Sequence, residues 1–530
     1  MLLGVVVLLV YLPSLSGGFL NLDDPWLIQH NALLVGDGHA LARIWTDLSR
    51  GTRLALGAEY LPLRDTNLWL EAHLWGLLPQ ALRASQLALY LGAVFLVRAA
   101  LHRTLADRRV AEVAAWVFAL HPVHVESVAW LAGRKDVLAL LFVGAALFVH
   151  AGRSRQRLWL VPLLCVCAAL SKAMAVVTVA LLFAQDLLAG RRPAWVVYAL
   201  SLAGAASVLA IDLHVGHQVG MVQKPPGGTW LTTLMTMGPV WLRYLAELAW
   251  PPLLSLVHDV PVLAAFTAAG VVGYLLLAAW LGVGLWLWRR RRPLGLVTFL
   301  WFFVPLLPVS QVLFPLQNLM ADRYLLLSVM APALALGALA VRFHRPGMLT
   351  AMACIAGLAL FSAQRASLFA FSEYVFADAT AKTRTSTLAP YQLAMALNEW
   401  HQREKAKKAF EEALRRAGDR PTEAARRSTN NLALILAHQH RLGEAERLLR
   451  RGRQLWPDDP EILGNLAEIV ARRGRESEGR RLYEELVRRF PDDAAAVRSY
   501  THRYGHPPRQ PAPGGVNTAA PANTTERPKP

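Results

Sequence analysis

Apolar runs recur from Met1 to about Phe361, separated by short polar connections. The rest of the chain is rich in Arg, Glu and Ala, and its apolar positions have helical spacing. A membrane-spanning helix needs about 20 mainly apolar residues. We therefore expect an all-α fold, with a polytopic membrane bundle over residues 1–365 and a helical domain behind it. The runs predict about eleven crossings, at residues 1–16, 82–101, 110–131, 137–151, 158–170, 174–189, 195–211, 263–288, 294–309, 325–341 and 348–363.

Two assignments decide the number of crossings. The stretch 158–189 is too long for one helix and has Lys172 near its middle, so we split it into a short hairpin. The stretch 230–250 carries charged residues such as Glu247, and a crossing there would put the basic cluster Arg289–Arg292 on the wrong side. We therefore expect it to lie flat on the outer interface as an amphipathic segment.

The N-terminal run and the basic loops set the orientation. Residues 1–16 lack a basic segment and a clear A-x-A cleavage site, which favours a first membrane helix over a removed signal peptide. With the N-terminus inside and an odd number of crossings, the C-terminal domain is expected outside, in a periplasm or lumen. Lys and Arg gather in cytoplasmic loops, and the clusters are Arg98–Arg109, Arg153–Arg157, Arg191–Arg192, Arg289–Arg292 and Arg342–Arg345.

The C-terminal quarter repeats itself with a period of 34 residues. Asn431-Leu432-Ala433 recurs at Asn465-Leu466-Ala467, and Pro457-Asp458-Asp459 recurs at Pro491-Asp492-Asp493. This period is the signature of tetratricopeptide (TPR) repeats, and a looser copy begins near Tyr391. We expect a connector at 366–390 and TPR repeats at 391–500, with a concave surface for a polypeptide. The many Arg residues there are typical of a solvated face, with a patch for acidic peptide or lipid headgroups as the alternative.

Composition narrows the class of protein. The chain is 55% hydrophobic and 17% charged, with a mean hydropathy of +0.32, which excludes an ordinary soluble globular protein. A net charge of +18 would suggest nucleic acid in a soluble protein. Here the Arg residues lie in loop clusters and repeats, so no nucleic-acid partner is expected. The three cysteines lie in apolar runs and predict no disulfide framework, and the Pro-rich residues 507–530 predict a disordered tail.

Five groups of ionisable residues fall at predicted outer helix ends or in the first outer loop, residues 17–81. Such groups at membrane depth are costly and mark functional sites. The alternative for each group alone is an interfacial anchor or an interhelical ion pair. Together they predict one polar site on the outer side. The groups are Asp23 with Asp24, Arg64 with Asp65, the set His121, His124, Glu126, Arg134, Lys135 and Asp136, then Lys172, and Asp322 with Arg323.

Asp23 and Asp24 are the strongest pair among these groups. Adjacent carboxylates raise each other's cost of ionisation, so their pairing favours a place where a cation, a proton transfer or a helix start uses them. Asp24 before Pro25 predicts a helix N-cap, which leaves Asp23 free to act as a base. His121 and His124 share a helix face only if the Pro between them does not interrupt it. We therefore expect them to bind phosphate or sugar rather than a metal.

The order of these motifs resembles a known family. NLDDPW, YLPLRD, HPVHVESVAWLAGRKDV, LSKAM and LQNLMADRYLLLS, with TPR repeats behind them, are similar to TMTC-like O-mannosyltransferases and their bacterial relatives, membrane glycosyltransferases of the GT-C class. The resemblance extends to about residue 500. Ala173 replaces the family's usual Pro, and Leu22 its usual Phe. The resemblance implies that Asp23 and Asp24 are catalytic and that the donor phosphate is bound by Arg64, Arg134, Lys135, Lys172 and Arg323, with Asp65, His121, His124, Glu126 and Asp322 in support.

The resemblance also implies a lipid-linked donor, a polyprenyl or dolichyl phosphate monosaccharide with mannose as the expected sugar. The acceptor is a hydroxyl, expected on protein Ser or Thr, on the outer face. Asp23, or else Asp24, would deprotonate the acceptor as it attacks the anomeric carbon. The leaving group is already a phosphate, so the site needs cations rather than a general acid, and one displacement inverts the anomeric centre. No further cofactor is firmly implied, and a divalent cation, used by some enzymes of this class, stays open.

Two rival functions stay open. One is a catalytically silent TPR scaffold, anchored in membrane lipid by a degenerate transferase fold and binding protein partners. The other is a sugar transferase that acts on a glycan or lipid. A transporter is disfavoured, because the polar residues gather on one face instead of lining a path through the bilayer. The Ala, Arg and Leu bias indicates a high-GC bacterium, so we expect an inner-membrane protein with a periplasmic TPR domain.

Overall fold

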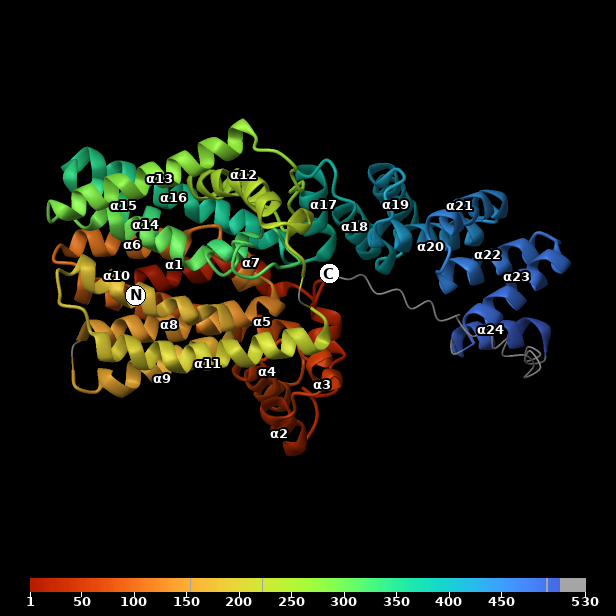
Figure 1. Cartoon of the computed structure of the whole chain (residues 1–530), viewed down its shortest axis with the longest axis horizontal. Helices are drawn as coiled ribbons and strands as arrows, with labels where there is room; N and C mark the ends of the chain where they lie inside the picture. The colour runs from red at the N-terminus through yellow and green to blue at the C-terminus, as the bar shows by residue number, and fades with distance from the viewer. Residues whose placement is uncertain (153, 222, 492–493, 506–530) are drawn as a thin grey trace, which may run out of the picture. The chain divides into compact units, whose positions relative to one another are not determined.

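The computed structural model describes residues 1–505 except 153, 222, 492 and 493, and these residues form helices and connections without any strand (Figure 1). The chain divides into two compact units, Met1–Trp400 and His401–Pro530. The all-α fold class predicted from the sequence is confirmed over this part of the chain. The predicted tail, 507–530, lies outside the described residues.

The first unit is a bundle of long and short helices, and Figure 1 shows α5, α8 and α9 lying side by side. Short 3-10 or π turns join some of them, including η1 (Leu12–Ser16), η2 (Pro25–Gln29), η3 (Leu131–Gly133), η4 (Ala173–Val177) and η7 (Asp322–Leu325). The α-helices are α1 (Leu2–Tyr11), α2 (Gly38–Thr46), α3 (Arg50–Ala55), α4 (Pro62–Trp75), α5 (Pro79–Thr104), α6 (Arg108–Leu120), α7 (His124–Ala129), α8 (Arg134–Gly152), α9 (Arg157–Ser171), α10 (Thr178–Leu188), α11 (Trp195–Val219), α12 (Trp230–Ala249), α13 (Ala268–Arg289), α14 (Leu294–Leu306), α15 (Met330–Arg342), α16 (His344–Leu368), α17 (Ser372–Lys382) and α18 (Leu388–Glu399).

The composition of these helices is that of a membrane protein. Five stretches of the described chain are long and apolar enough to cross a bilayer: Pro79–Thr104, Leu131–Gly152, Trp195–Val219, Ala268–Arg289 and His344–Leu368. Five shorter apolar stretches accompany them: Leu2–Ser16, Arg157–Ser171, Ala173–Leu188, Leu294–Leu306 and Met330–Arg342. Large apolar side chains on the long helices face outward, including Trp195, Leu275 and Leu360, as expected where lipid is the solvent. The predicted number of eleven crossings stays a prediction.

The predicted span 110–131 is broken in its middle. The run 110–131 breaks at His121, where α6 has ended and α7 has not begun. His121 has an extended backbone (φ −72°, ψ 128°), because a following Pro disfavours the helical conformation of the residue before it. By contrast, α9 ends at Ser171 and Lys172 is extended (φ −156°, ψ 110°), which is the interruption that the sequence predicts at this place.

The first loop folds into a small helical cap made by α2, α3 and α4. Its own apolar core consists of Leu33, Ala40, Ile44 and Leu56, with Trp69 packed against them. Buried Arg53 donates hydrogen bonds to the backbone carbonyls of Arg43, Ile44 and Asp47. Through these hydrogen bonds Arg53 holds the C-terminal end of α2 and the residue that follows it.

A buried arginine on α5 joins several connections at one end of the bundle. The Arg83 guanidinium donates to the carbonyls of Gly18 (2.6 Å), Ala129 (2.5 Å) and Phe369 (3.1 Å). These carbonyls belong to the first loop, the end of α7 and the residue after α16. The first loop and the chain that leaves α16 therefore lie at the same end of the bundle.

The second unit consists of paired helices. Small residues allow close packing within a pair, since a Cβ on Gly479 would lie 2.7 Å from the Ala471 Cβ. Asp459 caps α22 by accepting from the backbone N–H of Ile462 at 2.7 Å, and its counterpart in the repeat pattern, Asp493, lies outside the described residues. The helices are α19 (Arg403–Ala417), α20 (Glu423–His438), α21 (Leu442–Leu455), α22 (Pro460–Arg472), α23 (Glu476–Arg489) and α24 (Ala494–Tyr504).

Candidate functional site

A cavity that opens to solvent lies among α8, η4, α14 and the η7 turn, and the empty space in it and at its mouth is about 480 Å³. Its charged lining consists of Asp136, Lys172 and Arg323, three of the residues singled out in the sequence. The remaining lining is mainly apolar, with Leu140 and Pro305 as examples. The cavity therefore combines two cations and one carboxylate with an apolar interior.

Lys172 and Asp136 form an ion pair at this cavity. Asp136 lies in the first turn of α8 and is fully buried, whereas 21% of the Lys172 side chain is exposed. The extended backbone of Lys172 between α9 and η4 presents the side chain here instead of along a helix. The second carboxylate oxygen of Asp136 has no hydrogen-bond partner among the described residues.

Arg323 is oriented by Glu126. Its Nη1 donates to Glu126 Oε1 at 2.5 Å, and its backbone N–H donates to the other carboxylate oxygen at 3.3 Å. The guanidinium also lies over the rings of Trp130 and Tyr324, 5.5 and 5.4 Å from their centroids. Because 16% of the Arg323 side chain stays exposed and it lines the cavity, this cation is held in place yet accessible.

The two adjacent aspartates have different environments. Asp24 is fully buried, and its carboxylate accepts hydrogen bonds from the backbone N–H groups of Leu20 (2.8 Å) and Ala132 (2.9 Å). Burial raises the pKa of Asp24 to about 7, although the two hydrogen bonds act in the opposite direction. Asp24 precedes η2 as predicted, but its side chain ties the first loop to η3 instead of capping that turn.

Asp23 makes no side-chain hydrogen bond or ion pair with any other described residue and is only half-buried. Burial raises the pKa of Asp23, while the positive charges of Lys135, Arg323 and Arg64 lower it. These three cations all belong to the predicted donor-binding set. The geometry therefore brings a carboxylate without a partner into the field of the predicted cations.

Glu59 connects two of those cations, a role that sequence reasoning missed because no motif surrounds this residue. Its carboxylate accepts from Lys135 Nζ at 2.7 and 2.8 Å and from Arg64 Nη1 at 2.8 Å. Burial alone would raise the pKa of Glu59, but Lys135 and Arg64 lower it to about 2. Arg64 also pairs with Asp65 at 2.7 Å and donates to the Leu56 carbonyl, so neighbouring groups use all three of its guanidinium nitrogens.

Arg134 lies away from the cavity lining. Its guanidinium donates to Gln86, Asn67 and the Leu82 carbonyl and forms an ion pair with Glu71, and it is fully buried. These partners belong to α4 and α5, so Arg134 holds those helices to the start of α8. Its predicted contact with a donor phosphate stays a prediction.

The two histidines of the HPVH motif bind groups of the protein itself. His121 Nε2 lies 3.1 Å from the Leu248 carbonyl. His124 Nε2 lies 2.9 Å from the Leu326 carbonyl, and its Nδ1 lies 2.7 Å from the Tyr90 hydroxyl. Both imidazoles therefore join helices, and binding of phosphate or sugar by them stays a prediction.

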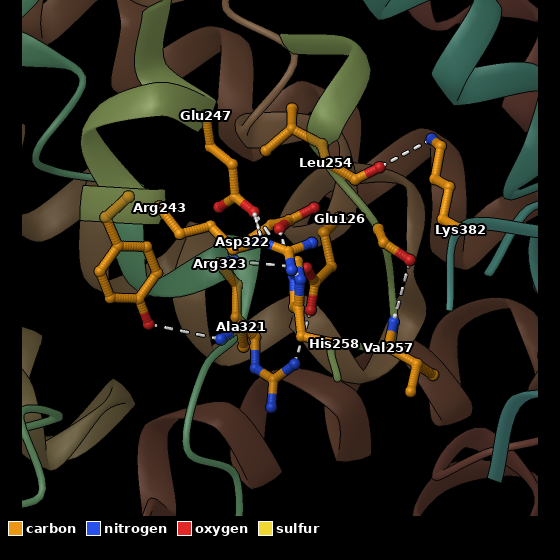
Figure 2. Close-up of polar contacts among 12 residues, drawn as sticks. Glu126, Arg243, Glu247, Leu254, Val257, His258, Ala321, Asp322, Arg323 and Lys382 are labelled. Atoms are coloured by element: carbon orange, nitrogen blue, oxygen red, sulfur yellow. Dashed lines mark hydrogen bonds and ion pairs between the residues drawn. The ribbon is translucent and has the colours of Figure 1, made fainter. Parts of the chain in front are cut away.

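Asp322 belongs to a second polar cluster, drawn in Figure 2. It accepts from His258 Nε2 at 2.7 Å and from Arg365 Nη2 at 2.6 Å. Glu247 lies beside His258, with its Oε1 3.7 Å from the ring Nδ1. Sequence reasoning identified only Asp322, because His258 and Arg365 stand alone in their segments and Glu247 was read as a charge on an amphipathic helix.

Fold and site together describe a helical protein of membrane-type composition with a TPR domain and a cationic cavity at one end of its bundle. A tetratricopeptide-repeat model matches residues 436–500, which confirms the TPR domain. Human protein O-mannosyl-transferase TMTC1 is 33% identical over 144 residues, covering 26% of this chain and 16% of the human protein. The mouse TMTC1 protein is 33% identical over 153 residues, or 28% and 16% of the two chains. The chain thus matches about a sixth of the length of these curated relatives.

Proposed function

We propose that the chain is a membrane glycosyltransferase. It transfers a monosaccharide, with mannose as the favoured sugar, from a polyprenyl or dolichyl phosphate to a hydroxyl acceptor on the non-cytoplasmic face. The main evidence is the cavity, which is lined by Lys172, Arg323 and apolar side chains. A lipid phosphate has the complementary chemistry, because it joins an anion to an apolar chain. Partial similarity to the protein O-mannosyl-transferase TMTC1 supports the reaction class.

The proposed reaction is a single displacement. The Asp23 carboxylate takes the proton of the acceptor hydroxyl while the hydroxyl oxygen forms a bond to the anomeric carbon. The bond from that carbon to the phosphate oxygen breaks, and its electron pair leaves with the lipid phosphate. Lys172 and Arg323 stabilise the charge that develops on this oxygen. Attack opposite the leaving group inverts the anomeric centre.

In this proposal the TPR domain binds the acceptor. TPR units bind polypeptides on concave surfaces, and a polypeptide held there would supply Ser or Thr hydroxyls. The acceptor is therefore proposed to be protein.

Transfer from labelled polyprenyl phosphate mannose to candidate peptides tests the proposal, with the purified full chain compared with Asp23→Asn. We expect Asp23→Asn to lose at least 100-fold in rate, the lower range of a general base. Asp107→Asn is the matched control, because Asp107 is a carboxylate at the start of α6 that pairs with the exposed Arg109 and does not line the cavity. Equal label in wild type and Asp23→Asn would reject the assigned base.

A non-catalytic scaffold anchored in the membrane is the second candidate, favoured by the match of the TPR model to residues 436–500. In that case Asp23→Asn leaves the phenotype of a deletion strain fully complemented. Removal of the TPR helices would then abolish complementation. Complementation by Asp23→Asn therefore separates the two candidates, because the transferase needs this carboxylate and the scaffold does not.

A further inference from the structure

Glu247, His258 and Asp322 come together from three separate segments. Glu247 lies near the end of α12, His258 in the connection to α13, and Asp322 at the start of η7. Each side chain offers an atom that could bind a metal ion, and these atoms all lie within 4.8 Å of one another. All three side chains are at most 1% exposed.

Two atoms of this cluster have no hydrogen-bond partner among the described residues: His258 Nδ1 and Glu247 Oε2. Buried polar atoms are normally paired. His258 Nε2 lies 2.7 Å from Asp322 Oδ1 and donates to it. In the neutral imidazole of this tautomer Nδ1 carries a lone pair, and it lies 3.7 Å from Glu247 Oε1. A cation between the lone pair and the carboxylate, either a metal ion or a second imidazole proton, satisfies both groups.

A divalent metal ion fits this arrangement. Zinc binds imidazole nitrogen and carboxylate oxygen at about 2.0–2.2 Å, so one ion can bridge two atoms that lie 3.7 Å apart. A histidine that binds a metal commonly donates its other ring N–H to a carboxylate, and Asp322 already accepts that proton. Mixed nitrogen and oxygen ligands favour zinc-like ions over Mg²⁺ or Ca²⁺, which prefer oxygen alone.

Two arginines already neutralise part of the acidic charge, and one carboxylate oxygen of Glu247 still has no hydrogen-bond partner among the described residues. Arg243 donates to Glu247 Oε1 at 3.1 Å, and its side chain is 35% exposed, so water screens this pair. Arg365 donates to Asp322 Oδ2, the oxygen that does not bind His258. Glu247 Oε2 therefore remains available for an ion.

We propose that His258 Nδ1 and Glu247 bind one zinc-like divalent cation, with Asp322 positioning the imidazole. The remaining coordination positions are open to water or to an anionic oxygen. The ion ties the end of α12 to the connection before α13. Because Asp322 directly precedes Arg323, it also fixes the segment that carries a cation of the cavity. This inference stands on the cluster alone and does not depend on the proposed transferase reaction.

Metal content of the purified full chain tests the proposal. The chain is prepared through a tag without histidine, treated with a chelator and titrated with Zn²⁺, or with Co²⁺ for its absorption spectrum. We expect one ion per chain in wild type, none in His258→Ala, and a 10- to 100-fold weaker affinity in Asp322→Asn, the usual effect of losing a group that orients a ligand. His214→Gln, which changes an exposed histidine of α11, should keep the ion.

Two outcomes would overturn the site. One is wild type that takes up no stoichiometric Zn²⁺ or Co²⁺, in which case a doubly protonated His258 joins two carboxylates as an ion-pair network. The other is His258→Ala that retains the ion. Glu247→Gln is the second variant, because it keeps the size of the side chain and should still weaken binding if His258→Ala fails to fold.

Discussion

The adjacent aspartates of the first loop have different roles because their neighbours differ. Both carboxylate oxygens of Asp24 accept hydrogen bonds, from the backbone N–H groups of Leu20 and Ala132. Asp23 has no such partner among the described residues. We therefore assign positioning to Asp24 and proton transfer to Asp23. The sequence alone does not distinguish the roles of two adjacent aspartates.

The charge of Lys135 sets the acid limb of the proposed activity. Burial raises the pKa of Asp23, and Lys135 is the strongest of the cations that lower it. A base must be ionised to act, so kcat/KM should rise with pH through this pKa. Lys135→Met removes a lowering influence, so the limb should move to higher pH in a profile of kcat/KM. Lys135→Arg keeps the charge and should keep the limb, whereas equal profiles for all three proteins would contradict Asp23 as the base.

The two cations of the cavity should contribute to the chemical step. Lys172→Met and Arg323→Met each remove a positive group near the proposed leaving phosphate, and a single such donor is worth about 100- to 1000-fold in kcat. Steady-state transfer measurements check this. Lys224→Met, a change at an exposed lysine after α11, serves as the control. A rise in KM with unchanged kcat would assign the two residues to donor binding alone.

The sequence predicted which residues carry charge at this end of the bundle but not where each side chain points. Lys172 and Arg323 line the cavity, whereas the guanidinium groups of Arg64 and Arg134 are occupied by neighbouring groups. The partners that occupy them, such as Glu59, are single acidic residues without a motif. Pairing of this kind depends on tertiary contacts, which spacing along one chain does not encode.

At the scale of helices, hydropathy predicted the apolar stretches, and one local interruption escaped it. Lys172 interrupts its apolar run as its polar side chain suggests. The run 110–131 was expected to be one helix and is broken at His121, although the following Pro marked the position. Hydropathy alone joined α6 to α7 across this position, because it does not register that a Pro disfavours the helical conformation of the residue before it.

Glu446 is the ionic centre of the TPR helices. Three arginines, Arg450, Arg473 and Arg475, donate to its carboxylate. Burial would raise the pKa of Glu446, but these hydrogen bonds lower it overall. The stability that Glu446 contributes is therefore present above its ordinary pKa and is lost as the pH falls through the lowered value.

Glu446→Gln should loosen α21 to α23 at neutral pH. The three arginines are about 40% exposed, and water weakens such pairs, so we expect a loss of about 1 kcal/mol, which is about fivefold in the opening equilibrium. Hydrogen exchange of these helices in the full chain measures this directly. Glu484→Gln is the control, because Glu484 is exposed and pairs only with Arg480 among the described residues. Equal exchange in wild type and Glu446→Gln would show that the cluster adds nothing.

At the scale of the first unit, contacts place the loop of Asp23 and the chain after α16 at one end of the bundle. Arg83 donates to carbonyls of both segments, Gly18 and Phe369. The Asn21 backbone N–H also donates to the Ser372 hydroxyl at 2.8 Å. Two of the basic connections contact each other, since Arg191, after α10, donates to the carbonyl of Arg103, near the end of α5, at 2.9 Å. This arrangement does not depend on the number of crossings, and it predicts that both segments face the same side of a membrane.

Labelling with a thiol reagent that does not cross membranes tests this sidedness. Cys165, Cys167 and Cys354 are first replaced by Ser, and single cysteines are then introduced by Asp37→Cys in the first loop, Ser477→Cys in the second unit and Arg291→Cys in a basic connection. The positive-inside rule puts Arg291 in the cytoplasm, so intact cells, or spheroplasts of a bacterial host, should label the first two and spare the third. Disruption of the membrane should expose all three. Labelling of Arg291→Cys alone in intact cells would place Asp23 in the cytosol, where a transferase of the outer face could not use it.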